Sequence, residues 1–427
     1  MSAATSSKAQ MQLGARFRAT RRRTLELCRP LTPEDMMVQS SAEASPVKWH
    51  LAHTAWFFES FILREFAPGY RLFHADFPWL FNSYYRSFAA FPQKHLRASF
   101  SRPGLEEVLR YRAHVDEGIE RLLEGSPEPE TLARIELGVH HEEQHQELLL
   151  TDILHAFFTN PLQPAYVQEA AGCGAAESGE VAPMRFAEFA GGLREIGYCG
   201  EDFSFDNERP RHRVWLEPYA LARRLVTNGE FAAFIADGGY RRPELWLSAG
   251  WDVVEQEGWK APLYWTGDEG DWSLFTLRGR QPLARLTAAP VCHVSYFEAD
   301  AYARWAGKRL ATEFEWEAAA AGAPVEGNLL ESGRLQAEPG AETTEGESAA
   351  QQLFGDCWEW TASAYLGYPG FSPLAGALGE YNGKFMSGQM VLRGGSCVTP
   401  AAHIRASYRN FFPPETRWQF SGLRLAE

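Results

Sequence analysis

The chain has 427 residues, of which 45% are hydrophobic, and its 41 basic and 55 acidic side chains give a formal net charge of -14. This length exceeds what one hydrophobic core usually organises, so we expect two globular domains. An acidic surface repels nucleic acids and anionic membranes, which argues against either partner and favours a small-molecule substrate.

The hydropathy pattern predicts neither a signal peptide nor a membrane span. The N-terminal stretch is basic but has no apolar core, and no later run reaches the ~18 to 20 apolar residues that a span needs. The cysteines form no C-x-x-C pair, which favours reduced, mostly buried thiols. They are Cys28, Cys173, Cys199, Cys292, Cys357 and Cys397. We therefore expect a cytoplasmic protein.

Four helices are predicted in the first 165 residues. Apolar residues recur at helical spacing over 13–29, 104–124 and 130–158. Ser45 and Pro46 predict the start of another helix, with Ser45 as N-cap and Pro46 in the first helical position, and its pattern continues to about residue 66. Four helices of this length favour a bundle, in which metal sites are built from side chains that project inward.

The connection over residues 68–103 is long and rich in aromatic residues, and it contains Tyr84, Tyr85 and Arg86. A connection of more than ~15 residues within a compact domain is commonly functional. Two interpretations are open. The aromatic residues either pack the loop against the bundle, or they form a lid that presents a phenol.

Composition changes after Pro161. Residues 166–183 are rich in glycine and other small residues and read as a linker. Residues 184–427 have short segments dense in glycine, tryptophan and proline, which predicts much irregular structure, short strands and two helices near 227–237 and 295–306. The acidic residues 324–350 are expected to form an exposed insertion.

The run HHEEQHQE at residues 140–147 carries a metal-ligand pattern, because His141 and His145 are four residues apart and share one face of a helix. The run also satisfies H-E-x-x-H, the signature of zinc metalloproteases. A metzincin would need a glycine at position 148 and a histidine at 151, where Leu148 and Thr151 stand. A gluzincin would need a glutamate from a downstream helix, but Glu169 lies in the predicted linker. A protease is therefore disfavoured.

A third ligand is expected from the predicted helix that contains WHLAH. His50 and His53 are three residues apart on nearby faces, and the residues alone do not decide between them. His140 points about 100° away from His141 on a helical wheel, so we expect a capped or exposed histidine there.

Several motifs carry a family resemblance. The segments RLATEFEWEAAA, CWEWTAS, VLRGGSC, RASYRN and SGLRL resemble, in this order, the hallmarks of the formylglycine-generating-enzyme or sulfatase-modifying-factor fold, a variant of the C-type-lectin fold. WHLAH and HEEQHQE resemble a DinB-type four-helix bundle with three metal histidines. Their fusion resembles the sulfoxide synthases of ergothioneine biosynthesis, also called hercynine oxygenases. The implied fold class is α+β, with a DinB-like bundle at 1–165 and a formylglycine-generating-enzyme-like domain at 184–427.

The resemblance implies a mononuclear non-haem iron(II) held by His53, His141 and His145, with an open face for O2 and a thiol. The reaction would join the thiol to hercynine, the trimethylated histidine betaine, and oxygenate the sulfur. Gln144 lies between the ligands and could reach the substrate imidazole. A trimethylammonium group is held by aromatic faces. The residues available for this substrate in the second domain are Tyr365, Tyr368, Phe411, Phe412 and Trp418, beside Asn410, which matches the family's hercynine-binding asparagine.

The sequence departs from the family pattern at the residues after Asn410. Phe411 replaces the usual tryptophan, and Phe412 replaces an aspartate found in relatives that use gamma-glutamylcysteine. Free cysteine is therefore the expected thiol. Its carboxylate would need a cation, for which Arg86 and Arg417 are candidates.

The family also uses a tyrosine as proton or hydrogen-atom donor. That tyrosine comes from the segment after WTAS, where Tyr365 and Tyr368 lie, whereas Tyr84 and Tyr85 in the long loop are a second source. The altered thiol pocket and the adjacent phenols favour Tyr84 and Tyr85 here.

Three rivals remain. A formylglycine-generating enzyme would need cysteines around SYRNFFPPE, and this segment has none. A synthase that acts on unmethylated histidine, as in ovothiol synthesis, commonly carries a methyltransferase domain, which we do not find. A non-catalytic protein with a structural zinc or iron site would consume no oxygen.

Overall fold

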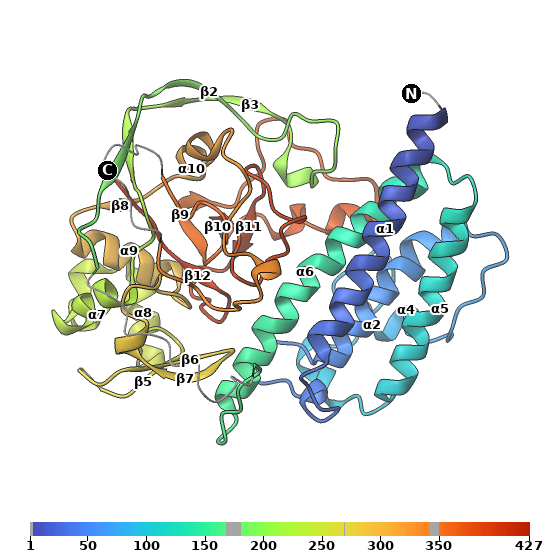
Figure 1. Cartoon of the computed structure of the whole chain (residues 1–427), viewed down its shortest axis with the longest axis horizontal. Helices are drawn as coiled ribbons and strands as arrows, with labels where there is room; N and C mark the ends of the chain where they lie inside the picture. Colours follow the sequence, from blue (N-terminus) through green and yellow to red (C-terminus); the bar gives the residue numbers. More distant parts are fainter. Residues whose placement is uncertain (1–2, 168–180, 269, 341–349) are drawn as a thin grey trace. The chain divides into compact units, whose positions relative to one another are not determined.

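A computed structural model describes residues 3–167, 181–268, 270–340 and 350–427 (Figure 1). The chain divides into two compact units. The first comprises Met1–Asn160 and Ala375–Tyr381, and the second comprises Pro161–Leu374 and Asn382–Glu427. The expected α+β class, with a helical unit and a mixed, partly irregular one, is confirmed.

The first unit is a helical bundle in which α1 lies against α6, while α2 lies against both α5 and α6 (Figure 1). Gly138 of α6 packs directly against Phe58 of α2, since an added Cβ would lie 2.5 Å from a carbon of that ring. The helices are α1 (Ala3–Cys28), α2 (Val47–Phe58), α3 (Arg64–Phe66), α4 (Phe77–Leu80), α5 (Leu105–Glu124) and α6 (Pro129–Thr159). None of the helices in these described ranges is long and apolar enough to cross a membrane.

The second predicted helix differs from expectation at its N-terminus, whereas helical structure continues to Phe66 as expected. Pro46 is the N-cap and no side chain caps this end. The Ser45 hydroxyl accepts a hydrogen bond from Arg97 at 2.7 Å, so the predicted Ser45 cap is wrong. After Phe58 the helix continues as one π-helical segment, Glu59–Leu63, and then as α3. Such π segments insert an extra residue per turn and so change which side chains face the core.

The long connection after α3 is not structureless. It contains α4 and a 3-10 helix at Lys94–Ser99, and Phe77, Phe81 and Tyr85 are buried. Asn82 orders the turn before Tyr85, because its side-chain oxygen accepts from the Tyr85 amide and its side-chain nitrogen donates to the Tyr85 and Ala89 carbonyls. These three aromatic side chains thus pack the loop against the bundle.

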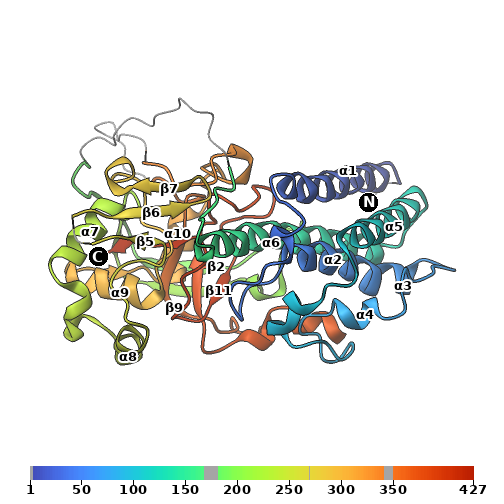
Figure 2. The ribbon, with the colours of Figure 1, turned by 90° about the horizontal axis from the view of Figure 1, so that it is seen from below.

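The second unit is built from short strands in small sheets, one of which, β5–β6–β7, is clearest in Figure 2. Two four-stranded sheets have the orders β1–β4–β13–β8 and β11–β10–β9–β12, and β2 pairs with β3. The strands are β1 (Phe186–Phe189), β2 (Gly192–Ile196), β3 (His212–Leu216), β4 (Tyr219–Ala222), β5 (Trp265–Thr266), β6 (Ser273–Thr276), β7 (Gly279–Pro282), β8 (Arg309–Leu310), β9 (Trp358–Ala364), β10 (Met390–Arg393), β11 (Asn410–Phe412), β12 (Ser421–Gly422) and β13 (Leu425–Ala426).

In the part of the second unit that the structure describes, four α-helices accompany these strands, so the expectation of two was too low. They are α7 (Asn228–Ala236), α8 (Ser248–Glu257), α9 (Tyr296–Trp305) and α10 (Glu313–Ala320). The helices α7, α9 and α10 each begin with a capping box, in which a serine or threonine hydroxyl and a glutamate three residues later bond each other's backbone amides.

Part of the predicted exposed insertion is packed. Leu329, Leu330 and Ala337 are buried, and the Asn328 side chain donates to Asp356 at 2.7 Å. The expectation was wrong there because these apolar side chains are dispersed among acidic and small residues. Residues 341–349 of the predicted insertion and residues 168–180 of the predicted linker lie outside the described residues.

Candidate metal centre

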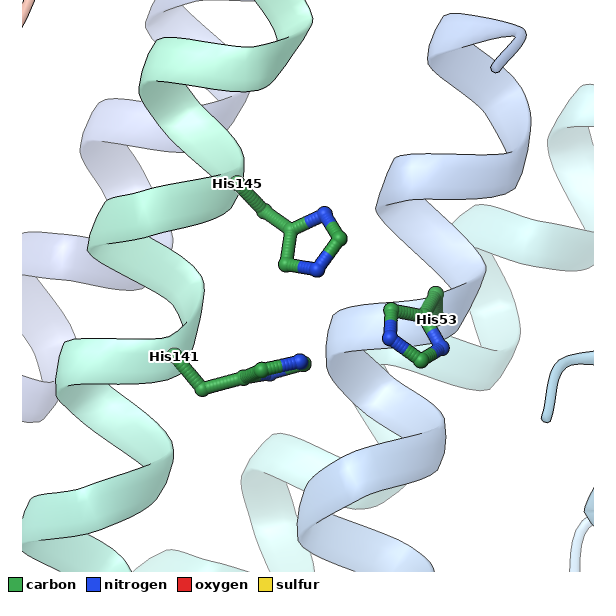
Figure 3. A group of neighbouring side chains, drawn as sticks. All are labelled: His53, His141 and His145. Atoms are coloured by element: carbon green, nitrogen blue, oxygen red, sulfur yellow. The ribbon is translucent and has the colours of Figure 1, made fainter. Parts of the chain in front are cut away.

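Three histidines of the first unit converge on one point (Figure 3). His53 and His141 are buried, and His145 is partly buried. His53 comes from α2, while His141 and His145 come from α6, where their four-residue spacing places them on one face. One ring nitrogen of each lies within 4.8 Å of the corresponding nitrogens of the other two. This arrangement can hold one metal ion.

Hydrogen bonds determine which nitrogen of two of these rings faces the cluster. The Nδ1 atom of His53 lies 2.6 Å from the Phe81 carbonyl oxygen, and Nδ1 of His145 lies 2.8 Å from Nδ1 of His50. A carbonyl accepts only from a protonated nitrogen, which leaves Nε2 of His53 with a lone pair. Nδ1 of His141 is buried and has no hydrogen-bond partner among the described residues.

All three rings are held neutral. Burial lowers the pKa of His141 to about 3. Burial also lowers the pKa values of His53 and His145 far below the ordinary 6.5, and the nearby rings lower them further. A neutral imidazole offers its lone pair to a metal.

The donor set fits the iron(II) that the resemblance implies. Three neutral imidazoles suit iron(II) and leave its double positive charge largely uncompensated, so that anionic ligands such as a thiolate are attracted. Imidazole also suits zinc, so the donor chemistry alone defines a divalent transition-metal site.

Glu142 does not face this site. Its carboxylate accepts from Arg21, Arg112 and Thr24, each at 2.7 Å, and is fully buried. Both carboxylate oxygens are therefore occupied by hydrogen bonds that connect helices of the bundle. Glu142 is not positioned to act as the base of a metalloprotease.

His140 is buried with 2% of its surface exposed, so it is not an exposed histidine, which was one of the two expectations for it. Its Nδ1 lies 3.4 Å from Glu143, and both residues contact Arg16 of α1. Packing of α1 over this face of α6 covers the ring.

A tyrosine that sequence reasoning missed lies beside the triad. Tyr381 belongs to the segment Ala375–Tyr381 of the first unit, and its ring centroid is 5.9 Å from that of His141. Its hydroxyl donates to the side-chain oxygen of Gln144. The sequence indicated Tyr381 only through its position in the segment after WTAS. Tyr365 and Tyr368 come before it in the same segment and were named as candidates instead.

The predicted phenols Tyr84 and Tyr85 stack with ring centroids 4.6 Å apart and hydroxyls 3.5 Å apart. Burial raises the pKa of Tyr84 to about 12 and that of Tyr85 well above 10, and the nearby Tyr84 and Tyr381 raise that of Tyr85 further. Both phenols are therefore protonated at neutral pH. Arg86 is exposed, with its guanidinium 5.7 Å from the Phe91 ring.

The other predicted substrate residues lie in the second unit. Tyr365 stacks on Phe411 at 4.0 Å, and Phe412 meets Trp418 edge to face at 5.5 Å. Asn410 begins β11, and its side-chain oxygen accepts from the Phe411 amide.

Two of these predicted residues already have strong partners. Tyr368 is buried, accepts a hydrogen bond from Arg393 and donates to Glu313. Arg417 pairs with Glu298 at 3.2 Å and lies 3.9 Å from the Trp259 ring centroid. Contacts of this kind hold side chains in place whether or not a ligand is bound.

The fold and the site together define a class. Residues 16–150 match the DinB superfamily, and residues 185–341 and 326–427 match the sulfatase-modifying factor enzyme 1-like domain. The protein thus combines a DinB bundle, which carries a three-histidine metal site, with a domain related to formylglycine-generating enzymes.

Curated relatives narrow this class. The chain is 35% identical to hercynine oxygenase of Mycolicibacterium smegmatis over 95% of this chain and 96% of that one. It is 33% identical to hercynine oxygenase of Mycobacterium tuberculosis over 97% and 98%. The formylglycine-generating enzyme of Thermomonospora curvata is 37% identical over 34% of this chain and 50% of its own. The chain belongs to the hercynine oxygenase family.

Proposed function

We propose that the protein joins the thiol of cysteine to the imidazole of hercynine and oxygenates the sulfur, using non-haem iron(II) and O2. The observation that carries this proposal is the triad of neutral histidines, in a chain whose full-length relatives are hercynine oxygenases. The balance is one imidazole C–H, one thiol S–H and one O2, which give one C–S bond, one S=O group and one water.

The histidines and Gln144 have distinct tasks in this proposal. His53, His141 and His145 would hold iron(II), which when bound supplies open coordination positions and electrons for O2 chemistry. The Gln144 oxygen accepts from Tyr381, so its amide nitrogen is oriented as a donor. We assign that nitrogen to the hercynine imidazole.

The proton donor is proposed to be the Tyr84–Tyr85 pair. Both phenols are protonated at neutral pH, and a phenol can donate as oxygen gains negative charge during turnover. Tyr381 is the competing donor, because its ring contacts His141.

We propose that residues of the second unit bind the cation of hercynine and that a residue of the long loop binds the carboxylate of cysteine. Hercynine has a trimethylammonium group, for which we propose the aromatic faces of Phe412, Trp418 and the Tyr365–Phe411 stack, beside Asn410. Arg86 is the proposed partner of the cysteine carboxylate, because it is exposed whereas Arg417 is paired with Glu298.

The activity is tested with protein loaded with iron(II) without oxygen and then exposed to air, hercynine and cysteine. We expect one O2 consumed per sulfoxide, measured with an oxygen electrode and mass spectrometry. The His141→Ala variant and zinc-loaded protein are the controls and should consume none. An iron-loaded wild-type protein that binds the metal but forms no sulfoxide would contradict the proposal.

The choice of thiol is tested separately. Phe412 cannot pair with the extra amine of gamma-glutamylcysteine, so kcat/KM should be far higher for cysteine. Phe412→Asp should raise kcat/KM for gamma-glutamylcysteine. The change in kcat/KM for cysteine should be smaller than this increase. Equal specificity constants for the two thiols in the wild type would disprove this choice, and histidine in place of hercynine tests an ovothiol-type synthase in the same assay.

A further inference from the structure

His50 and Asp152 form a chain of contacts behind His145. Nδ1 of His50 lies 2.8 Å from Nδ1 of His145, and Nε2 of His50 lies 3.0 Å from Oδ2 of Asp152. His50 and Asp152 are both buried, with 3% and 5% of their surfaces exposed. The chain thus runs from a carboxylate through one imidazole to a proposed ligand.

The Asp152 carboxylate determines which nitrogen atoms of His50 and His145 carry protons. A carboxylate oxygen accepts hydrogen bonds, so we place a proton on Nε2 of His50 and a lone pair on Nδ1 of His50. That lone pair accepts from Nδ1 of His145, and the lone pair of His145 is then on Nε2, the nitrogen directed at His53 and His141.

Asp152 is itself held in position. Its Oδ2 accepts the Ser45 amide at 2.8 Å, and the Ser45 hydroxyl accepts from Arg97 at 2.7 Å. The Arg97 guanidinium lies 3.5 Å from the centroid of Trp49, and this indole stacks on His53 at 4.3 Å. The same group of residues therefore fixes two of the three proposed ligands.

The three proposed ligands differ in what lies behind them. His145 is backed by a carboxylate through His50, His53 by the neutral Phe81 carbonyl, and Nδ1 of His141 by no hydrogen-bond partner among the described residues. Partial negative charge behind an imidazole makes its other nitrogen a stronger donor. The ligand field is therefore expected to be unequal, with His145 as the strongest donor.

We propose that His50 and Asp152 are positioning residues for the metal centre, which fix Nε2 of His145 as the metal-facing nitrogen and strengthen it as a donor. The inference rests on the metal site of the proposed function and is independent of the substrate. In this proposal both histidines of WHLAH have a role: His53 is a ligand, and His50 positions the ligand His145.

Cobalt(II) titration of the purified full-length protein tests the proposal without turnover, because the d–d absorption of cobalt reports the ligand field. His50→Ala and Asp152→Asn should weaken cobalt binding by about 10–100-fold while retaining one ion per chain. Both should also shift the d–d bands. His53→Ala, which removes a ligand, should abolish binding.

Glu59→Gln is the matched control. Glu59 is a fully buried carboxylate of the same bundle that accepts from Tyr70, Tyr111 and the Phe73 amide. Its neutralisation should lower Tm but leave the cobalt affinity and spectrum unchanged. Apo-protein Tm verifies folding of each variant, and Asp152→Asn, which preserves side-chain size, provides the answer if His50→Ala does not fold.

Two results would overturn the proposal. Unchanged affinity and spectra in the folded Asp152→Asn and His50→Ala variants would remove any positioning role. Loss of binding in His50→Ala equal to that in His53→Ala would make His50 a ligand. A wild-type protein that binds cobalt as expected but forms no sulfoxide with iron would instead contradict only the proposed function.

Discussion

The ring of His53 is held on both faces by tryptophans. Trp49 and Trp56 stack on it with centroid separations of 4.3 and 5.1 Å, both at 14° between planes, and Nδ1 is bonded to the Phe81 carbonyl. A ring fixed in this way cannot rotate to exchange its nitrogens. The ligand nitrogen is therefore set before metal arrives, which reduces the ordering cost of binding.

The phenol that acts as donor can be identified by removing one hydroxyl at a time. Phe substitution of the donor should abolish sulfoxide, with the thiol dioxygenated instead, while metal content stays unchanged. We expect this for Tyr84→Phe or Tyr85→Phe, and about a tenfold or smaller rise in KM for Tyr381→Phe through the freed Gln144 amide. Product analysis by mass spectrometry distinguishes the three variants. A switch of product only in Tyr381→Phe would transfer the donor role to that residue.

The residues of the site differ in how far a sequence can reveal them. The pairing of His141 with His145 follows from helical periodicity, because both belong to one helix. The choice between His50 and His53 does not, since it depends on how far α2 is rotated against α6. Tyr381 lies far along the chain from α6, and no local pattern connects it with Gln144.

Among the elements, α1, α5 and α6 are joined by one buried charge cluster. The pKa of Glu142 is raised by burial, but Arg112 and Arg21 outweigh that effect and bring it to about 2. Arg21 also pairs with Asp116 of α5 at 2.6 Å. One carboxylate on α6 therefore compensates two guanidinium groups from the two other helices.

Neutralising this carboxylate should destabilise the bundle. Glu142→Gln leaves Arg21 and Arg112 buried without their shared counter-ion, at a cost of about 3–5 kcal/mol in the free energy of unfolding. Because Glu142 is not a base in the proposed reaction, the folded fraction should keep sulfoxide synthesis. Glu130→Gln is the control, since Glu130 is 64% exposed in its pair with Arg134 and should cost less than about 1 kcal/mol. Urea unfolding measures both.

The same cluster predicts how acid affects stability. The folded pKa of Glu142, about 2, lies below its ordinary value of 4.5, so its contribution is complete above pH 4.5 and is lost as pH falls toward 2. Unfolding free energies of apo-protein should therefore fall more steeply over this range in the wild type than in Glu142→Gln. Parallel profiles for the two proteins would disprove a shared counter-ion at this position.

At the scale of the whole chain, the two compact units are not contiguous in sequence, whereas the predicted domains are. The four helices of residues 1–165 could be predicted because amphipathic periodicity is a local property of the sequence. The segment Ala375–Tyr381 nevertheless belongs to the first unit. Its short, glycine-rich sequence has no periodicity, and its contacts with a loop near residue 86 are formed only in the folded chain.

Glu380 is the residue that attaches this segment to the loop of Tyr84 and Tyr85. Its carboxylate accepts the amides of Arg86 at 3.1 Å and Ser87 at 2.9 Å, and also the Ser87 hydroxyl. These bonds are partly exposed, so we assign them about 1 kcal/mol in total. They restrain the backbone next to the proposed donor pair.

Trypsin provides a direct measure of this restraint, because the exposed Arg86 precedes a bond that must unfold locally before it is cut. Glu380→Ala should speed cleavage after Arg86 about fivefold, the factor that corresponds to about 1 kcal/mol when opening is fast. Glu331→Ala, which removes a carboxylate bonded to the Ala401 amide in the second unit, should leave cleavage after Arg86 unchanged. Equal cleavage rates in the wild type and Glu380→Ala would mean that other contacts order the loop, and the segment would then matter to the site only through Tyr381.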